Sequence, residues 1–338
     1  MTKPVKKTSH KKALFIIIPS VFLYALIQFG LINSTRIAEQ FEYCSFKPTA
    51  QIAQLVTDSG MNDRGKFYFY ITQPQIDGKD AFNQHCPDDE TEENVVFGCY
   101  TRQPDDRIYI YNITDSKVKD IVSVTAAHEM LHAVYERMNS GERNKIDKML
   151  KDQLAKTTDP DLLATVKFYD KFEPGERYNE LHSIFGTEVA QLSPELEKYY
   201  DKYFSNRSKV VEQAAKYKKV IDDMKAQEEQ LNAQLETLKN EIDAQEAAYT
   251  AAADQLSRDI SNFNSCADTV GCFSSMSRFN SQRANLLARE SALDAQYDAI
   301  NQTIDEYNAV VEKYNALGTE AKKLMQSIDS RAPAMATD

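Results

Sequence analysis

The feature that most constrains the fold is a hydrophobic repeat in the last third of the chain. From Val210 to Leu256, and again from Phe279 to Ile328, apolar side chains recur at alternating spacings of three and four residues. In the second arm the repeat passes through Gly318 and Met325. A repeat sustained over several heptads is typical of a coiled coil. Two long helices are therefore predicted for this part of the chain.

The two arms flank Cys266 and Cys272 almost symmetrically. We therefore predict an intramolecular antiparallel hairpin over residues 206–330, whose tip lies near residues 264–276. At 1.5 Å per residue, each arm is about 75–80 Å long. Pairing of the arms between two chains is the alternative. Residues 331–338 are interpreted as a C-terminal tail.

The N-terminus has the pattern of a membrane anchor. Residues 1–12 contain five lysines and no acid, and residues 13–32 form an apolar run without a charge. About 20 apolar residues are what a helix needs to cross a bilayer. We predict a cytosolic basic tail at 1–12 and a transmembrane signal anchor at 13–32. The following residues then lie outside the cytosol, at the cell surface. A cleaved signal peptide is the alternative, although its apolar core is usually only about 7–15 residues long.

Charge excludes one class of ligand. The formal net charge is −11, and residues 1–36 carry +6, so the remainder carries −11 − 6 = −17. Nucleic-acid binding needs clustered Lys and Arg. No nucleic-acid partner is therefore expected.

The cysteines fit an extracytoplasmic location. Of the five in the chain, Cys86 and Cys99 are close in sequence, as are Cys266 and Cys272. Because no C-x-x-C pair occurs, a cysteine metal site is poorly supported. Two structural disulfides, Cys86–Cys99 and Cys266–Cys272, are predicted, which an oxidising compartment would allow. Cys44 is left over.

Residues 37–205 are predicted to form one α+β domain. Its strands are expected first and its helices mainly after them, which favours an α+β fold over a doubly wound sheet. The expected strands are 66–72, 95–100 and 107–113. The expected helices are 48–58, 118–138, 142–155, 160–171 and 178–192.

The helix predicted at 118–138 carries the motif H-E-x-x-H, with His128, Glu129 and His132. Two histidines at i and i+4 lie on one face of a helix, so both imidazoles can reach one tetrahedral ion. Glu129 lies beside them and can take a proton from water on the metal. The motif therefore predicts a Zn²⁺ site with Glu129 as the general base.

In these residues the chain resembles the zincin metallopeptidases over residues 107–191. The segment Tyr178-Asn179-Glu180-Leu181-His182-Ser183 is similar to the glutamate helix of the gluzincins, the thermolysin-like group. This resemblance implies that His128, His132 and Glu180 are the ligands of a His₂Glu zinc site. Glu188 and His182 remain alternatives for the third ligand. Gluzincins frequently have a histidine-orienting acid where this chain has Ile184.

The resemblance implies a zincin-like catalytic domain behind the anchor, and hence a membrane-anchored zinc metallopeptidase. A peptide or protein substrate would add along an edge strand, for which residues 107–113 are the candidate. If His182 is not a ligand, then His182 or Tyr178 would stabilise the oxyanion or orient the general base. The hairpin would bind a protein partner.

The alternative is a surface adhesion or scaffolding protein that acts through the hairpin. Its zinc site would then be structural or vestigial. The two functions differ in the fourth coordination position, which a catalytic zinc keeps open and a structural zinc does not.

Overall fold

The structure is a computed structural model in which residues 34–87, 95–102 and 106–332 are described. The predicted basic tail and transmembrane anchor, and the tail after residue 332, lie outside these ranges. Among the described residues, no helix is both long and apolar enough to cross a membrane. The chain divides into two compact units, one extending to Tyr217 and including the residues from Ser327 onward, the other comprising Lys218–Gln326.

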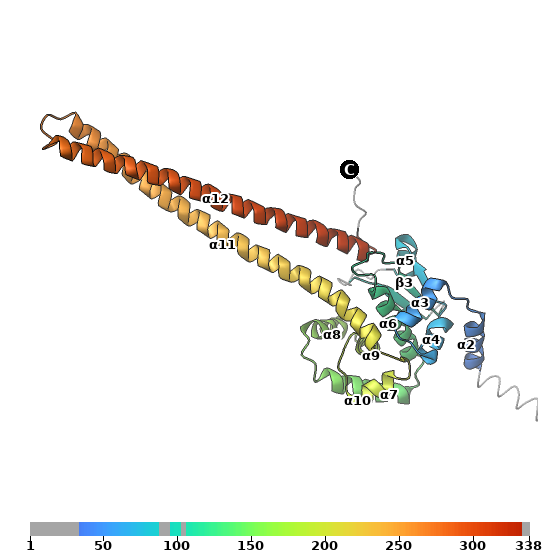
Figure 1. Cartoon of the computed structure of the whole chain (residues 1–338). Coiled ribbons are helices and arrows are strands. Elements are labelled where there is room, and N and C mark those ends of the chain that lie inside the picture. The colour runs from blue at the N-terminus through green and yellow to red at the C-terminus, as the bar shows by residue number, and fades with distance from the viewer. Residues whose placement is uncertain (1–33, 88–94, 103–105, 333–338) are drawn as a thin grey trace, which may run out of the picture. The chain divides into compact units, whose positions relative to one another are not determined.

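The described chain is mostly helical, with one small sheet and two long helices (Figure 1). The helices of the first unit are α2 (Ser34–Ser45), α3 (Ala50–Asp58), α4 (Asp63–Ile71), α5 (Lys79–His85), α6 (Ile121–Glu136), α7 (Ser140–Leu154), α8 (Pro160–Phe172), α9 (Arg177–Thr187) and α10 (Pro194–Tyr200). The long helices are α11 (Ser208–Ala267) and α12 (Met276–Ile328).

The sheet has three strands in the order β1–β3–β2. The strand β1 (Gln75–Asp77) pairs in parallel with β3 (Arg107–Tyr111), and β2 (Gly98–Thr101) pairs with β3 in the antiparallel sense. The prediction that residues 107–113 form an edge strand is therefore wrong. Because β3 lies in the centre, both of its edges are already hydrogen-bonded, and β2 is the edge strand on the antiparallel side.

The predicted strand at residues 66–72 is also wrong, since this segment lies in helix α4. The side chain of Asn62 caps the helix by accepting hydrogen bonds from the backbone N–H groups of Arg64 and Gly65. Gly65 also lets the helix approach Tyr203, where a Cβ would lie 2.3 Å from the backbone oxygen. Capping and tertiary packing thus override the β propensity of the aromatic residues.

Helix α6 forms the centre of the first unit. It packs against the sheet and against α3, α4 and α9. Almost every residue of α6 is buried, including the apolar Val124, Met130 and Leu131. A helix that is covered on nearly every side holds its side chains in fixed positions. Polar side chains on such a helix are therefore well placed to form a site.

Helix α9 approaches α6 closely at Gly186. A Cβ at this position would lie 2.3 Å from Leu131 Cδ1 and 2.8 Å from Tyr200 Cε1. Leu181 and Phe185 of α9 are fully buried in the same layer. The helix ends at Thr187, earlier than the predicted boundary at residue 192. Glycine thus allows α9 to lie against the helix that carries the H-E-x-x-H motif.

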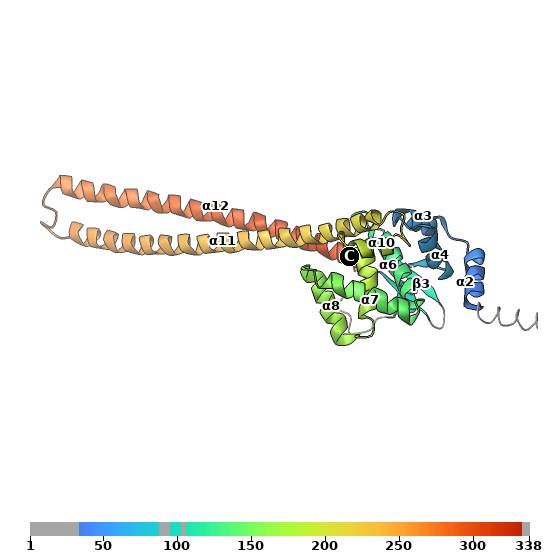
Figure 2. The same cartoon turned by 90° about the horizontal axis from the view of Figure 1, so that it is seen from below.

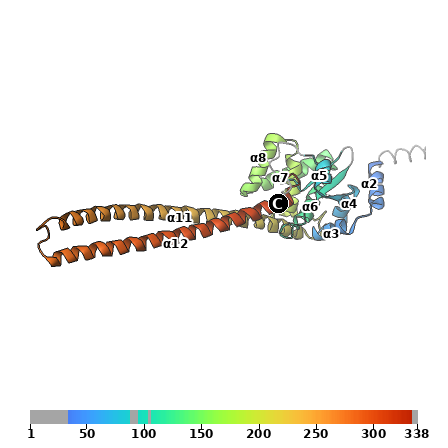
Figure 3. The ribbon, with the colours of Figure 1, turned by 90° about the horizontal axis from the view of Figure 1, so that it is seen from above.

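In the second unit, α11 and α12 run antiparallel, side by side, and are joined by a short turn (Figures 2 and 3). Arg289 of α12 donates a 2.7 Å hydrogen bond to Asp259 of α11. Farther from the tip, the Tyr249 and Tyr297 rings lie 6.3 Å apart. These contacts join the two arms within one chain. The disulfide predicted at the tip, Cys266–Cys272, is present.

The apolar seam differs from the prediction near the end of α12. The heptad pattern placed Gly318 and Met325 on the seam, but both are exposed, Met325 to 43%. Leu317 and Leu324 take their places, and Leu324 is only 3% exposed. Both pairs of positions fit spacings of three and four residues, so the spacing alone could not choose between them.

The second predicted disulfide, Cys86–Cys99, is also present. Cys86 follows the last residue of α5 and Cys99 lies in β2, so the bond ties this helix to the edge of the sheet. Cys44, the remaining cysteine, is free and exposed on α2.

Candidate metal centre

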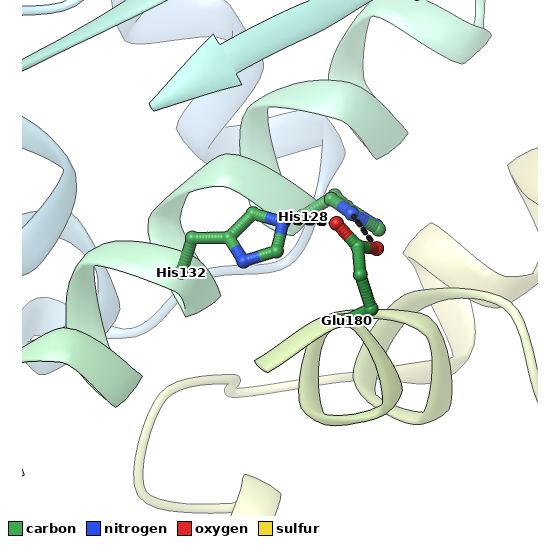
Figure 4. Close-up of side chains that lie close together, drawn as sticks. All are labelled: His128, His132 and Glu180. Carbon is green, nitrogen blue, oxygen red and sulfur yellow. Dashed lines mark ion pairs between the residues drawn. The ribbon is translucent and has the colours of Figure 1, made fainter. Parts of the chain in front are cut away.

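Two elements bring the predicted ligands together. His128 and His132 project from adjacent turns of α6, and Glu180 projects from α9 so that its carboxylate points at both imidazoles (Figure 4). Glu180 Oε1 lies 3.3 Å from His132 Nε2, and Glu180 Oε2 lies 3.4 Å from His128 Nε2. One ligand atom from each residue lies within 4.8 Å of the others. The three side chains form a candidate metal site of the His₂Glu kind.

The cluster is compact enough to surround one ion. Glu180 approaches the two histidines through different oxygens, at 3.3 Å through Oε1 and at 3.4 Å through Oε2. With metal–ligand bonds of about 2.0–2.1 Å, two ligands of a tetrahedral zinc are separated by about 3.3 Å, so the side chains would close slightly from their 4.8 Å spread around an ion. The donor set, two imidazoles and one carboxylate, is one that suits zinc. The residues present could therefore hold a metal ion of the kind that the motif predicts.

His132 is held in one orientation by a hydrogen bond outside the cluster. Its Nδ1 lies 2.9 Å from Asn179 Oδ1, and the Asn179 amide donates to Glu176 at 2.9 Å. Because Asn179 Oδ1 can only accept, the proton of a neutral His132 ring is on Nδ1. The lone pair of Nε2 is then free to point toward Glu180, as a metal ligand requires. The sequence analysis did not assign this role to Asn179.

Glu188 lies beside His128 on the side away from Glu180. Its Oε1 is 3.6 Å from His128 Nδ1, whereas the Nε2 atom of the same ring faces Glu180. The Glu188 side chain is 46% exposed, and the residue directly follows Thr187, the last residue of α9. This geometry makes Glu188 an ion-pair partner of His128 on the edge of the ring that faces away from Glu180.

The other two side chains considered for the site lie elsewhere. His182 is completely buried, and its Nε2 lies 2.7 Å from the Tyr199 hydroxyl, so that nitrogen is occupied. Burial, together with the positive charge of His132, lowers the pKa of His182 to about 3. Tyr178 is half-buried and its ring is covered by the guanidinium of Arg177. Neither His182 nor Tyr178 belongs to the cluster.

The electrostatics of the cluster favour positive charge at its centre. Burial by itself would lower the pKa of His128 and of His132, but the neighbouring carboxylate of Glu180 outweighs it and raises both. Burial would likewise raise the pKa of Glu180, but the two imidazoles hold it well below its usual value. A carboxylate between two imidazoles stabilises a cation there, whether protons or a metal carry the charge.

Glu129 lies on α6 next to the ligand histidines and is buried against the sheet. A Cβ on Gly98 of β2 would lie 3.1 Å from Glu129 Oε1 and 2.5 Å from Thr125 Cγ2. Burial raises the pKa of Glu129, while the charges of His132 and His128 act in the opposite direction. A carboxylate whose pKa is raised toward neutrality is a better general base. Gly98 gives this carboxylate room beside the edge strand.

Helix α11 contributes one residue near the site that the sequence analysis placed only in the heptad repeat. Tyr217 lies within the first compact unit, and its ring packs edge-on against Phe97 at 5.6 Å. Burial raises the pKa of its hydroxyl, and so does the nearby charge of Glu188. The first turns of α11 thus lie beside the residues that precede β2 and beside Glu188. The heptad repeat alone could not predict that Tyr217 contacts these residues.

Comparison with known proteins finds no relative of this chain. No family model, curated protein or solved structure matches the chain. The interpretation of the cluster therefore rests on its own geometry, which is consistent with the His₂Glu site of a zincin.

Proposed function

We propose that the protein is a zinc metallopeptidase of the gluzincin type, held at the outer face of a membrane by the segment at residues 13–32. One observation supports this above the others. The H-E-x-x-H histidines and Glu180 come together from two helices, with Glu129 next to them on α6. Zinc bound there would supply an activated water molecule and polarise the scissile carbonyl.

The chain's own residues divide the remaining work. Asn179 and Glu188 orient His132 and His128, so that the Nε2 atom of each ring faces the centre. Glu129 takes the proton of the attacking water on its carboxylate and passes it to the leaving nitrogen of the cleaved peptide bond. The burial of Glu129 supports this role, because it raises the pKa of the carboxyl group and makes the carboxylate a stronger base toward the attacking water.

The substrate is proposed to pair with β2 rather than with β3. In the part of the chain that the structure describes, one edge of β2 pairs with β3 and no strand pairs with the other. Gly98 places that strand directly beside Glu129. An extended peptide added to a sheet edge gains main-chain hydrogen bonds. Such a peptide would lie across the general base.

The test uses the full-length protein loaded with zinc and a proteome-derived peptide library, in which mass spectrometry detects new termini. We expect the wild type to produce new termini and Glu129→Gln to lose at least about 100-fold of that rate, because a positioned general base contributes 10²–10⁴-fold. Glu129→Gln should keep its zinc. The matched control is Glu195→Gln, which removes an exposed carboxylate on α10.

The control should cleave at the wild-type rate. If Glu129→Gln also cleaved at that rate, the proposed mechanism would be wrong. If the zinc-loaded wild type produced no new termini, the peptidase proposal itself would be wrong, and the adhesion or scaffolding function of the hairpin would become the better hypothesis.

A further inference from the structure

Helix α2 contacts the rest of the first unit through one face. Arg137 Nε donates a 2.9 Å hydrogen bond to Glu39, and Gln73 donates to Glu42. The Tyr43 ring lies 5.2 Å from Phe67 of α4. Glu42 and Tyr43 follow Glu39 by three and four residues, so the three side chains share one side of the helix. This side is the docked face of α2.

The opposite side of α2 is an apolar stripe. Ile37 is 54% exposed, Phe41 is 70% exposed, and Cys44 is an exposed free thiol. Their spacings of four and three residues place them together on one face, about half a turn from the docked face. We call Ile37, Phe41 and Cys44 the outer stripe. Large apolar side chains at spacings of three and four residues are typical of a helix face that packs against another helix.

The position of α2 in the chain suggests what covers the outer stripe. The helix begins at Ser34, directly after the apolar run at residues 13–32 that the sequence predicts to be a membrane anchor. If the anchor holds every copy in the same orientation, then α2 of each copy leaves the membrane in the same direction. Two copies that meet in the membrane plane would therefore bring these helices together in parallel, with like residues opposite each other.

The net charge of α2 favours a protein rather than a lipid surface as the partner that packs on this stripe. Helices that lie on membrane surfaces are rich in Lys and Arg. Helix α2 carries one base, Arg36, and two acids, Glu39 and Glu42, which gives 1 − 2 = −1. An anionic membrane surface would repel this helix rather than attract it.

We propose that α2 packs against α2 of a second copy of this chain along the outer stripe, with Cys44 of the two copies joined by a disulfide. Ile37 and Phe41 would pack against their counterparts. Parallel helices pack about 8–10 Å apart, and Cα atoms lie about 2.3 Å from each axis, so facing Cα atoms are about 3.4–5.4 Å apart. A disulfide needs a Cα separation of about 4.4–6.8 Å.

The chemistry of the bond requires an oxidant. Two Cys44 thiols form one S–S bond when an external disulfide takes up their two electrons and two protons and is reduced to two thiols. Cys86–Cys99 and Cys266–Cys272 are already disulfides in this structure, so oxidising conditions are consistent with the other four cysteines of the chain. The Cys44 thiol accepts a 3.4 Å hydrogen bond from Gln40 of the same helix.

The contact depends on the membrane. A helix of 12 residues is about 18 Å long, and its stripe buries far less than the roughly 1,200 Å² of a stable interface. Two anchors in one membrane raise the effective concentration of the stripes and make up for the small area. This inference rests on the predicted anchor and not on the peptidase function, so each can fail separately.

The experiment uses the full-length protein in native membranes, quenched with N-ethylmaleimide and run on non-reducing gels. We expect a band at twice the mass of the 38.5 kDa chain that disappears with dithiothreitol and is lost in Cys44→Ser. In the Cys44→Ser background, Phe41→Cys should restore the band. Glu42→Cys, on the docked face, is the matched control and should give at least tenfold less.

A second variant tests the stripe without a cysteine. Ile37→Asp combined with Phe41→Asp changes two exposed side chains, so the fold should tolerate it, and the dimer band should fall at least tenfold. Equal cross-linking through positions 41 and 42, or an unchanged band in the Asp variant, would mean random collision and would overturn the proposal. A fluorophore on Cys44 that is quenched by brominated phosphatidylcholine, with no dimer band, would place the stripe in lipid and overturn it too.

Discussion

His132 presents one ring nitrogen to the cluster because its other nitrogen is already engaged. Asn179 holds Nδ1 at 2.9 Å, and Glu176 in turn holds the amide of Asn179. Each hydrogen bond restricts the rotation of a side chain, His132 or Asn179, so metal binding loses less conformational entropy. The site is thus oriented before any cation arrives.

We expect Asn179→Ala to weaken zinc binding about 10–100-fold, the usual cost of losing a partner that orients a ligand. The measurement is a competition titration against a chromophoric chelator. Asn179→Asp is the control, because it keeps an oxygen acceptor for His132 Nδ1. Equal zinc affinity in Asn179→Ala and the wild type would show that the hydrogen bond does not orient the ligand.

At this scale the sequence predicted the three side chains that lie together, but not the residues that contact and orient them. His128 and His132 are at positions i and i+4, which share one face of a helix, so their proximity could be predicted from the sequence. Glu180 and Glu188 are eight residues apart, close to two helical turns, so spacing could not choose between them. In the structure Glu180 lies in the candidate cluster, whereas Glu188 follows the end of α9 at Thr187 and lies beside His128 Nδ1.

At the scale of elements, the contact between α6 and α9 sets the shape of the site, because each helix carries part of the ligand set. That contact is tight at Gly186, where no side chain separates α9 from Leu131 and Tyr200. The distance between Glu180 and the two histidines therefore depends on a residue that touches none of them.

We expect Gly186→Ala to lower the free energy of unfolding by about 1–3 kcal/mol, the usual cost of overpacking. It should also weaken zinc binding, because a Cβ forces α9 away from α6. The control is Gly318→Ala in α12, where a Cβ meets nothing within 4 Å and alanine should stabilise the helix by up to about 1 kcal/mol. Denaturant unfolding followed by circular dichroism measures both. Wild-type stability in Gly186→Ala would contradict the tight packing.

Elements were predictable where a repeat or a motif was long. The hairpin and helix α6 extend over many residues, so their periodicity outweighs local exceptions. Segment 66–72 was mistaken for a strand because its aromatic residues favour β structure, whereas the cap at Asn62 and the contact at Gly65 act from outside the segment. The order β1–β3–β2 could not be foreseen, since strand order depends on contacts between distant residues.

At the scale of the whole molecule, the chain divides into one unit that contains the candidate metal site and a second unit that consists of the hairpin. All three predicted ligands belong to the first unit, and the Cys266–Cys272 disulfide belongs to the second. Metal binding should therefore stabilise one unit, and the disulfide the other.

We expect a chelator to lower the melting temperature of the first unit and to leave that of the hairpin unchanged. A ligand present at 1,000 times its Kd stabilises the state it binds by about 4.1 kcal/mol, which is lost when the ligand is removed. Cys266→Ser combined with Cys272→Ser should have the reverse effect. Differential scanning calorimetry measures both, and a chelator that shifted only the hairpin transition would contradict this division.

The most direct test of the His₂Glu site is the amount of zinc bound per chain in four proteins: the wild type, His132→Ala, Glu180→Ala and Glu188→Ala. We predict about one zinc in the wild type, little in His132→Ala and Glu180→Ala, and a retained but weaker site in Glu188→Ala, because Glu188 orients a ligand without being one. Zinc lost with Glu188→Ala but kept with Glu180→Ala would contradict the ligand set. A wild type that binds no zinc after reconstitution would contradict the metal site altogether.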